Sequence, residues 1–397
     1  MREVLRTPGA PTLFAAACVA RLPMGALGLL FVLHTQQLTG SYAKGGLVAG
    51  VNAIALSLSN PLLARVVDRR GQSLVVRAGA PIAAAAIVAG ALLPASAPLG
   101  AILACAAVAG AAQPPIGACM RALWPALLDD PVLRHTAYAM EGVVLEVVYI
   151  CGPLLIVAGI GSWSPAAAMV ACAVFMVGGG LAFAAHPVSR GWRPHADRAR
   201  DLTGALRAGG VRVLVAVFLL CGLAVGAVEV AVPAALDAMG HRGLTGLLLG
   251  VWGVGSMLAG FTVARIGVGP DPPRRLALLL AAWGATHAVI GAAGSPLVLG
   301  LLLLLAGAAI APTFVCVNAM LDGLAPTGTL TEAFTWTSTG MQAGAAAGSA
   351  LGGALVEAAS PGVAMAVLGG GGILAALVVR AASSGTLRPV VAGGYSS

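Results

Sequence analysis

Long apolar segments alternate with short polar segments along the whole chain. About twelve of these segments hold roughly 20 hydrophobic residues each, the length that an α-helix needs to cross the hydrocarbon core of a bilayer. They are rich in Ala, Gly, Leu and Val and lack the two-residue alternation of outer-membrane strands. The pattern therefore predicts an all-α integral membrane protein with twelve transmembrane helices. The predicted helices span residues 12–36, 45–65, 74–94, 98–127, 137–160, 164–186, 211–235, 244–266, 276–294, 296–321, 333–357 and 361–381.

The composition agrees with a protein surrounded by lipid. Hydrophobic residues make up 59% of the 397 residues and charged residues only 9%, whereas soluble domains carry about 25% charged residues. The mean hydropathy is +0.96. The chain therefore lacks the polar surface that a soluble fold needs, and we expect membrane lipids to be its surroundings.

The net charge of +8 follows the predicted topology. Arginines gather in alternate connections, most densely at 186–210, while the opposite connections hold only Lys44 and Arg242. This asymmetry is the positive-inside pattern, so we expect both termini in the cytoplasm. The basic balance then reports membrane orientation, and we expect no nucleic-acid partner.

Few residues offer catalytic or cofactor chemistry. The seven cysteines lie inside apolar segments without a C-x-x-C spacing, which favours a role as small hydrophobic residues. We find no H-E-x-x-H, no D-D-x-x-D and no Gly-rich phosphate loop with a lysine. We therefore expect no metal, no cofactor and no ATP as the energy source. A membrane-embedded enzyme acting on lipids is the alternative class, but its usual motifs are missing.

The chain repeats itself once. The polar stretch at 186–210 separates six predicted helices from six, and residues of the two halves match at an offset of 196 to 200. At offset 196, Glu146 and Gly152 correspond to Gln342 and Gly348. Duplicated six-helix units are a transporter architecture with the substrate site near the bilayer midplane. We predict an N-terminal bundle at 1–185, a cytoplasmic linker at 186–210 and a C-terminal bundle at 211–397.

A charged motif, ARVVDRRG at 64–71, lies between the second and third apolar runs, which predicts a short loop there. It resembles the G-x-x-x-D-R-x-G-R-R loop of the major facilitator superfamily, with matches at Asp68, Arg69 and Gly71. The resemblance implies two pseudo-symmetric six-helix bundles and transport by alternating access. It also implies that Asp68 faces the N-terminus of the eleventh helix and latches the outward-open state, with Arg69 and Gly71 in the same latch. We expect Arg121 and Glu141 to add a pair across the hairpin of helices 4 and 5.

Other stretches resemble drug-exporter-like members of this family from actinobacteria: RLPMG at 21–25, TGSYAKGGLVAG at 39–50, AYAMEGVVLEVVYICGP at 137–153 and TEAFTW at 331–336. The resemblance implies a monomeric transporter in the bacterial inner membrane that exports a small, amphiphilic organic molecule by proton-coupled antiport. Of the antiporter signature in helix 5, only Gly152 and Pro153 remain. A proton-coupled importer or a lipid flippase of the same fold stays open as an alternative.

Two charged residues lie deep in apolar segments, Glu146 in helix 5 and Arg21 in helix 1. A charge at such depth costs about 2.5–3.5 kcal/mol on insertion scales, and intramembrane ionisable residues mark transport pathways. We predict that Glu146 is the proton-coupling carboxylate and that Arg21 is its partner. A static ion pair that only holds the helices together is the structural alternative. Glu229, late in helix 7, is a second candidate for proton coupling.

Proline pairs predict where the substrate cavity lies. Pro114 and Pro115 interrupt helix 4, and Pro312 interrupts the matching helix 10. Breaks in corresponding helices of a repeated transporter point to a central site. We therefore expect a cavity near these breaks, lined by polar and aromatic residues of the apolar helices: Asn52, Gln113, Pro115, Tyr149, Trp252, Asn318, Trp336 and Gln342.

Overall fold

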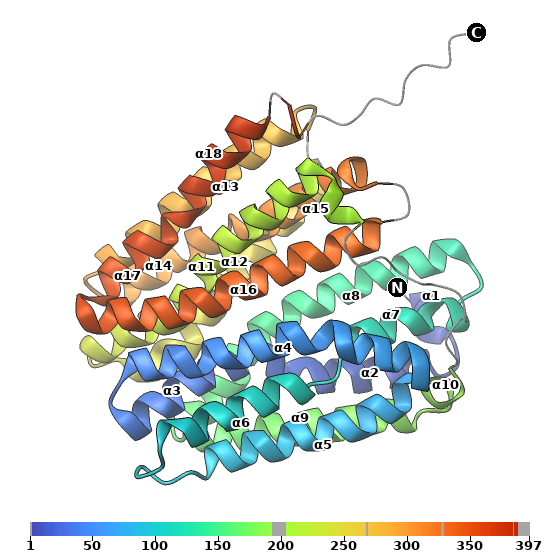
Figure 1. Ribbon diagram of the computed structural model, residues 1–397, viewed down its shortest axis with the longest axis horizontal. Coiled ribbons are helices and arrows are strands. Elements are labelled where there is room, and N and C mark those ends of the chain that lie inside the picture. The colour runs from blue at the N-terminus through green and yellow to red at the C-terminus, as the bar shows by residue number, and fades with distance from the viewer. Residues whose placement is uncertain (1, 193–203, 267–268, 327–328, 384, 388–397) are drawn as a thin grey trace. The chain divides into compact units, whose positions relative to one another are not determined.

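The computed structural model describes residues 2–192, 204–266, 269–326, 329–383 and 385–387, and its regular elements there are all helices. The chain forms two compact units (Figure 1). Unit 1 comprises Met1–Arg198 with Gly240–Gly250, and unit 2 comprises Ala199–Met239 with Val251–Ser397. Residues 193–203 of the predicted linker lie outside the described residues.

In unit 1 the first membrane helix is interrupted once, by a short 3₁₀ turn between α2 and α3. Its elements are α1 (Arg2–Arg6), α2 (Ala10–Arg21), the 3₁₀ helix η1 (Leu22–Gly25), α3 (Leu27–Thr39), α4 (Tyr42–Arg70), α5 (Gln72–Ala91), α6 (Leu99–Ala112), α7 (Ile116–Leu127), α8 (Pro131–Cys151), the π-helix η2 (Gly152–Gly161), α9 (Pro165–Ala185) and α10 (Pro187–Gly191). The 3₁₀ helix η4 (Arg242–Leu244) also belongs to this unit. Helix α5 packs against both α6 and α9.

Unit 2 contains two long uninterrupted helices. Its elements are η3 (Ala205–Arg207), α11 (Gly209–Ala238), α13 (Pro272–Val289), η5 (Ile290–Ala292), α14 (Pro296–Gly307), α15 (Ile310–Leu324), α16 (Leu330–Ala358), α17 (Pro361–Gly369) and α18 (Gly371–Ala382). Helix α12 (Thr245–Ile266) starts among the residues of unit 1 and continues in unit 2.

The predicted membrane helices are found. Ten helices of the described residues are long and apolar enough to cross a membrane. They coincide with ten of the twelve predicted spans. The other two predicted spans, 137–160 and 333–357, fold as α8 with η2 and as α16.

The predicted proline breaks are confirmed. Gln113 and Pro115 have non-helical backbone angles and separate α6 from α7. Proline has no N–H and its ring collides with the carbonyl four residues earlier, so the helix ends before it. In the matching segment, α14 ends at Gly307 and α15 begins at Ile310, two residues before Pro312.

The charged motif at 64–71 is helical, which corrects the predicted loop. Helix α4 runs through Arg70, and α5 begins at Gln72. Only Gly71 lies between them, with φ of 89°. That left-handed backbone is accessible to glycine at little cost, which explains the glycine of the motif.

Each unit has its own apolar core. Trp124 and Phe183 are fully buried in unit 1, and Phe14 packs on Trp124 with ring centroids 5.9 Å apart. In unit 2, Trp283 is fully buried, and Phe218 and Phe314 pack with centroids 4.7 Å apart.

Candidate functional site

The break in the first membrane helix positions a buried arginine. Helix α2 ends at Arg21, and Pro23 in the next turn cannot donate the N–H that an α-helix needs. The chain tightens into η1 and resumes as α3. Arg21 therefore lies in the last turn of α2, where the helix dipole favours a cation. Its Nε donates a hydrogen bond to the carbonyl of Ala17 over 3.1 Å.

Two glycines bring this break against α8 and η2. A β-carbon on Gly25 would collide with the Val148 carbonyl, and one on Gly152 would collide with the backbone of Gly25. Pro153 follows directly, and its ring cannot fit an α-helical turn, so the chain widens into the π-helix η2. Irregular helical turns of both segments thus meet beside Arg21.

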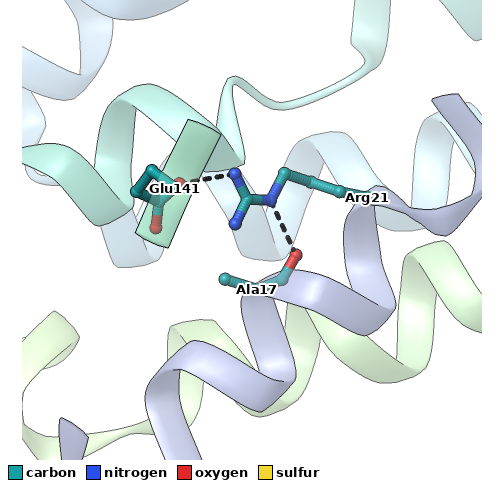
Figure 2. Close-up of polar contacts among 3 residues, drawn as sticks. All are labelled: Ala17, Arg21 and Glu141. Carbon is teal, nitrogen blue, oxygen red and sulfur yellow. Dashed lines mark hydrogen bonds and ion pairs between the residues drawn. The ribbon is translucent and has the colours of Figure 1, made fainter. Parts of the chain in front are cut away.

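The structure joins Arg21 to Glu141 of α8. Nη1 of Arg21 donates to Oε2 of Glu141 over 2.6 Å (Figure 2). The two side chains are only 4% and 3% exposed. Charges so deeply buried are tolerated when each has an opposite partner, and removal of one partner is strongly destabilising. The pair therefore connects the break in the first helix to α8.

Each side chain of the ion pair has one terminal atom that makes no hydrogen bond with the described residues. Nη2 of Arg21 and Oε1 of Glu141 are buried and have no hydrogen-bond partner among the described residues. In Figure 2 both atoms point to the same side of the pair. A buried polar atom without a partner costs about 1–3 kcal/mol. One donor and one acceptor of the buried pair thus remain without a hydrogen-bond partner among the described residues.

A second arginine lies near this pair. A β-carbon on Gly117 of α7 would lie 3.4 Å from Nη1 of Arg21 and 3.8 Å from Nη1 of Arg121. Arg121 is exposed, and the structure does not form the predicted pair between Arg121 and Glu141. The carboxylate of Glu141, which was predicted to pair with Arg121, pairs with Arg21.

The predicted partner of Arg21 cannot be placed. The side chains of Glu146 and Asp68 lie outside the described part of the structure, so their predicted roles stay predictions. Arg69, of the same predicted latch as Asp68, is exposed near the end of α4. Glu229 lies in α11 of unit 2, where it is partly buried and makes no hydrogen bond or ion pair with the described residues.

The predicted cavity residues in unit 1 differ in burial. Asn52 is buried, and its Nδ2 donates to the Ala106 carbonyl over 2.9 Å, which ties α4 to α6. Gln113 is buried at the break before Pro115. Tyr149 is 45% exposed. Asn52 therefore has a packing role in this unit, whereas nearly half of the Tyr149 surface is exposed.

In unit 2 the predicted residues spread over three helices. Asn318 is exposed on α15, and Trp336 and Gln342 are partly buried on α16. Trp252 of α12 lies edge-on to His287, with ring centroids 5.9 Å apart. Sequence reasoning missed that His287 is fully buried and stacked on Trp283, with centroids 5.3 Å apart. The four-residue spacing of Trp283 and His287 on one helix face was the available signal.

Among the described residues, no group of three or more His, Cys, Asp or Glu side chains could hold a metal ion. The Arg21–Glu141 pair is therefore the candidate site with the clearest chemistry.

Comparisons with known proteins agree with the fold. The family model described as Major Facilitator Superfamily matches residues 13–282. No curated protein matches the chain. A crystal structure of the nucleoside transporter NupG is similar, with a TM-score of 0.72 and 14% identity over 93% of this chain and 98% of that chain. A POT family transporter in complex with 5-aminolevulinic acid has a TM-score of 0.73 and 13% identity over 95% of this chain and 96% of that chain.

Proposed function

The chain belongs to the Major Facilitator Superfamily and is a membrane transporter, not an enzyme, and we propose that it exports a small amphiphilic organic molecule in exchange for protons. The observation that carries the proton coupling is the buried pair of Arg21 and Glu141. Ionisable residues inside a membrane are costly and mark proton and substrate pathways. This pair also lies where two helices change their geometry.

The pair supports a simple coupling step. When Arg21 and Glu141 are in contact, each offsets the charge of the other. When the conformational change of transport separates them, a lone carboxylate in an apolar surrounding is more stable with a proton. Return to the paired state expels that proton. Conformation and proton transfer are therefore linked through one hydrogen-bonded contact.

The unused atoms of the pair give the substrate a way to take part. Nη2 of Arg21 and Oε1 of Glu141 are a donor and an acceptor on the same side of the contact. A polar substrate group that bonds to them weakens the contact between the two residues. Substrate and proton then compete for the same pair, which is the requirement for exchange of one against the other.

Direction and substrate rest on sequence features. Export is supported by the drug-exporter-like stretches, and an amphiphilic substrate by the neutral aromatic candidates Tyr149 and Trp336. The arginine distribution supports the bacterial inner membrane with both termini inside. The solved neighbours are a nucleoside and a peptide transporter by name, but 12–14% identity carries only the fold. We propose no cofactor and a monomer as the functional form.

The experiment is transport in proteoliposomes with an imposed pH gradient. Ethidium and other fluorescent amphiphiles serve as probes, and internal pyranine reports proton movement independently. We expect the wild type to move probe and protons in opposite directions. Glu141→Gln keeps a hydrogen-bonding side chain but cannot release a proton, so we expect it to lose gradient-driven transport and to retain probe exchange.

Two outcomes decide against parts of this proposal. Probe and proton movement in the same direction would indicate an importer, and probe movement without protons would indicate a flippase or a uniporter. If Glu146→Gln loses coupling while Glu141→Gln keeps it, the coupling carboxylate is Glu146 and the Arg21–Glu141 pair is structural.

A further inference from the structure

Unit 1 contains a pocket at the ends of α3 and η2 and the starts of α9 and α12. Its volume is about 210 Å³, and all its lining residues belong to unit 1. That is smaller than the roughly 300–1,000 Å³ of sites for drug-sized ligands. The pocket therefore suits one headgroup or a single-ring molecule. It is lined by a different set of residues from the Arg21–Glu141 pair.

Arg242 supplies the charge in this pocket. Its Nη2 donates to the Leu33 carbonyl over 3.1 Å. A guanidinium has five N–H donors, and those of Arg242 make no other hydrogen bond among the described residues. No Asp or Glu lines the pocket. The wall therefore presents an uncompensated cation whose donors are available to a ligand.

The guanidinium stands on a rigid wall. The Thr245 hydroxyl donates to the Arg242 carbonyl over 2.7 Å at the start of α12. One residue later, a β-carbon on Gly246 would collide with the backbone of η2 at Pro153 and Ala158. The first turn of α12 is thereby packed directly on the π-helix. A positioned arginine loses less conformational freedom when it binds an anion than a mobile surface arginine does.

The remainder of the pocket is apolar and aromatic. Leu33, Val157 and Pro165 contribute aliphatic surface, and Trp163 is 92% exposed. A tryptophan with this exposure offers a flat face for an apolar ring or chain. Cation and apolar surface are thus adjacent, which is the arrangement that an amphiphilic anion requires.

We propose that this pocket binds the carboxylate or phosphate group of an amphiphilic anion, with Arg242 holding the charge and Trp163 covering the apolar part. Arginine binds both groups by paired, charge-assisted hydrogen bonds. The predicted topology puts the pocket on the outer face, where lipid headgroups and soluble acids both reach it. Binding here does not depend on proton coupling at Glu141.

The test is a fluorescence titration of the full-length protein in detergent, with benzoate as the anionic probe and benzyl alcohol as its neutral counterpart. The part of the signal that Trp163→Phe removes belongs to Trp163. We expect saturable binding of benzoate and at least tenfold weaker binding of benzyl alcohol. Arg242→Gln keeps a polar side chain but removes the charge, so we expect at least a tenfold loss of benzoate affinity.

A second variant guards against misfolding of the first. A β-carbon at Gly243, which lines the pocket, would have open space around it. Gly243→Leu therefore adds a side chain to the pocket lining and keeps the arginine, and we expect it to weaken benzoate binding at least fivefold. The proposal would be overturned if Arg242→Gln and Gly243→Leu both bound benzoate as tightly as the wild type does. It would also be overturned if the wild type bound benzyl alcohol as tightly as benzoate.

A competition arm separates the two sources of the anion. Dihexanoyl phosphatidate and inorganic phosphate are each titrated against bound benzoate. Displacement by phosphatidate at a tenfold lower concentration than by phosphate assigns the pocket to lipid headgroups. Equal displacement assigns it to soluble acids. Failure of both to displace benzoate contradicts the proposed anion site.

Discussion

The corresponding helix pairs of the two units are built in different ways. In unit 2, α11 and α16 are continuous helices of 30 and 29 residues. Glycines on both helices make their contact, since a β-carbon on Gly226 or Gly348 would collide with the backbone of the other helix. In unit 1 the first membrane helix is interrupted by η1, and α8 passes into η2. There the contact includes the buried ion pair of Arg21 and Glu141.

Because the two units are sequence repeats, this difference between them can be traced to individual corresponding residues. At the offset of 196 residues, Thr337 of α16 corresponds to Glu141. Thr337 is 2% exposed, and its hydroxyl donates to the Ala333 and Phe334 carbonyls of its own helix. One unit therefore has a charge that needs a partner where the other has a self-satisfied hydroxyl. Helix breaks and charge coincide in unit 1, so the step that depends on protons is expected there.

The largest effect is expected from removal of one member of the ion pair. Arg21→Ala leaves Glu141 as a buried charge without its cation, so we expect the free energy of unfolding to fall by about 3–5 kcal/mol. Thermal unfolding of the purified protein in detergent, followed by the fluorescence of a thiol-reactive dye, measures this. A loss below about 1 kcal/mol would mean that the pair is solvated in the folded protein.

The matching double variant separates stability from coupling. Hydrophobic replacement of a whole buried pair is often neutral or stabilising. Arg21→Met combined with Glu141→Leu should therefore recover most of the lost stability and still lack gradient-driven transport. Recovery of coupled transport in the double variant would show that proton transfer occurs elsewhere.

The glycine contact of unit 2 should give the next largest effect. Gly226→Ala forces a methyl group against the Ala345 carbonyl of α16, and overpacking of this kind costs about 1–3 kcal/mol. Gly178 of α9 is the matched control, because a β-carbon there meets nothing within 4 Å. Gly178→Ala should stabilise the helix by about 0.5–1 kcal/mol. The same unfolding measurement compares them, and equal effects at the two sites would contradict glycine-mediated packing.

Much of the fold was predictable because membrane spans leave a simple signal. Length and apolarity alone placed the helices, and the missing N–H of proline located the breaks at Pro115 and near Pro312. The 3₁₀ turn at Leu22–Gly25 was not predicted, although Pro23 is part of it. The π-helix that begins at Gly152 was also not predicted, although Pro153 is part of it. The close approach of Gly152 to Gly25 joins segments that are distant in the sequence.

The site was half predictable. The depth of Arg21 in an apolar run indicated a buried charge that needs a carboxylate. The structure pairs it with Glu141. An arginine side chain leans back towards the start of its helix, as the bond of Arg21 to Ala17 shows, and Glu141 lies nearer the start of α8 than Glu146 does. The side chain of Glu146 lies outside the described residues, so its predicted pairing with Arg21 stays a prediction. The position of a residue within an apolar run indicates how deep its Cα atom lies in the membrane. Which residue it pairs with also depends on the direction of its side chain.

A small effect is expected at the position that corresponds to Glu141. Thr337→Val removes a hydroxyl that bonds only to its own helix, and such bonds add little to helix stability. We expect a stability change of about 0.5 kcal/mol or less and gradient-driven transport within about twofold of the wild type. Loss of coupling in Thr337→Val would remove the proposed asymmetry between the two units.

The smallest effect is expected at Glu229, the other candidate carboxylate. It lies in the continuous helix α11, is partly buried and has no cation partner among the described residues. Its own carbonyl lacks a helix donor because Pro233 lies four residues later. Among the described residues, no hydrogen bond or ion pair of Glu229 is present that a conformational change could break, so we expect Glu229→Gln to keep more than half of the gradient-driven transport. The measurement is the same proteoliposome assay, with Glu141→Gln run beside it. If Glu229→Gln stops coupled transport and Glu141→Gln does not, the proton site lies in unit 2, and the ion pair of unit 1 serves only to hold the broken helix against α8.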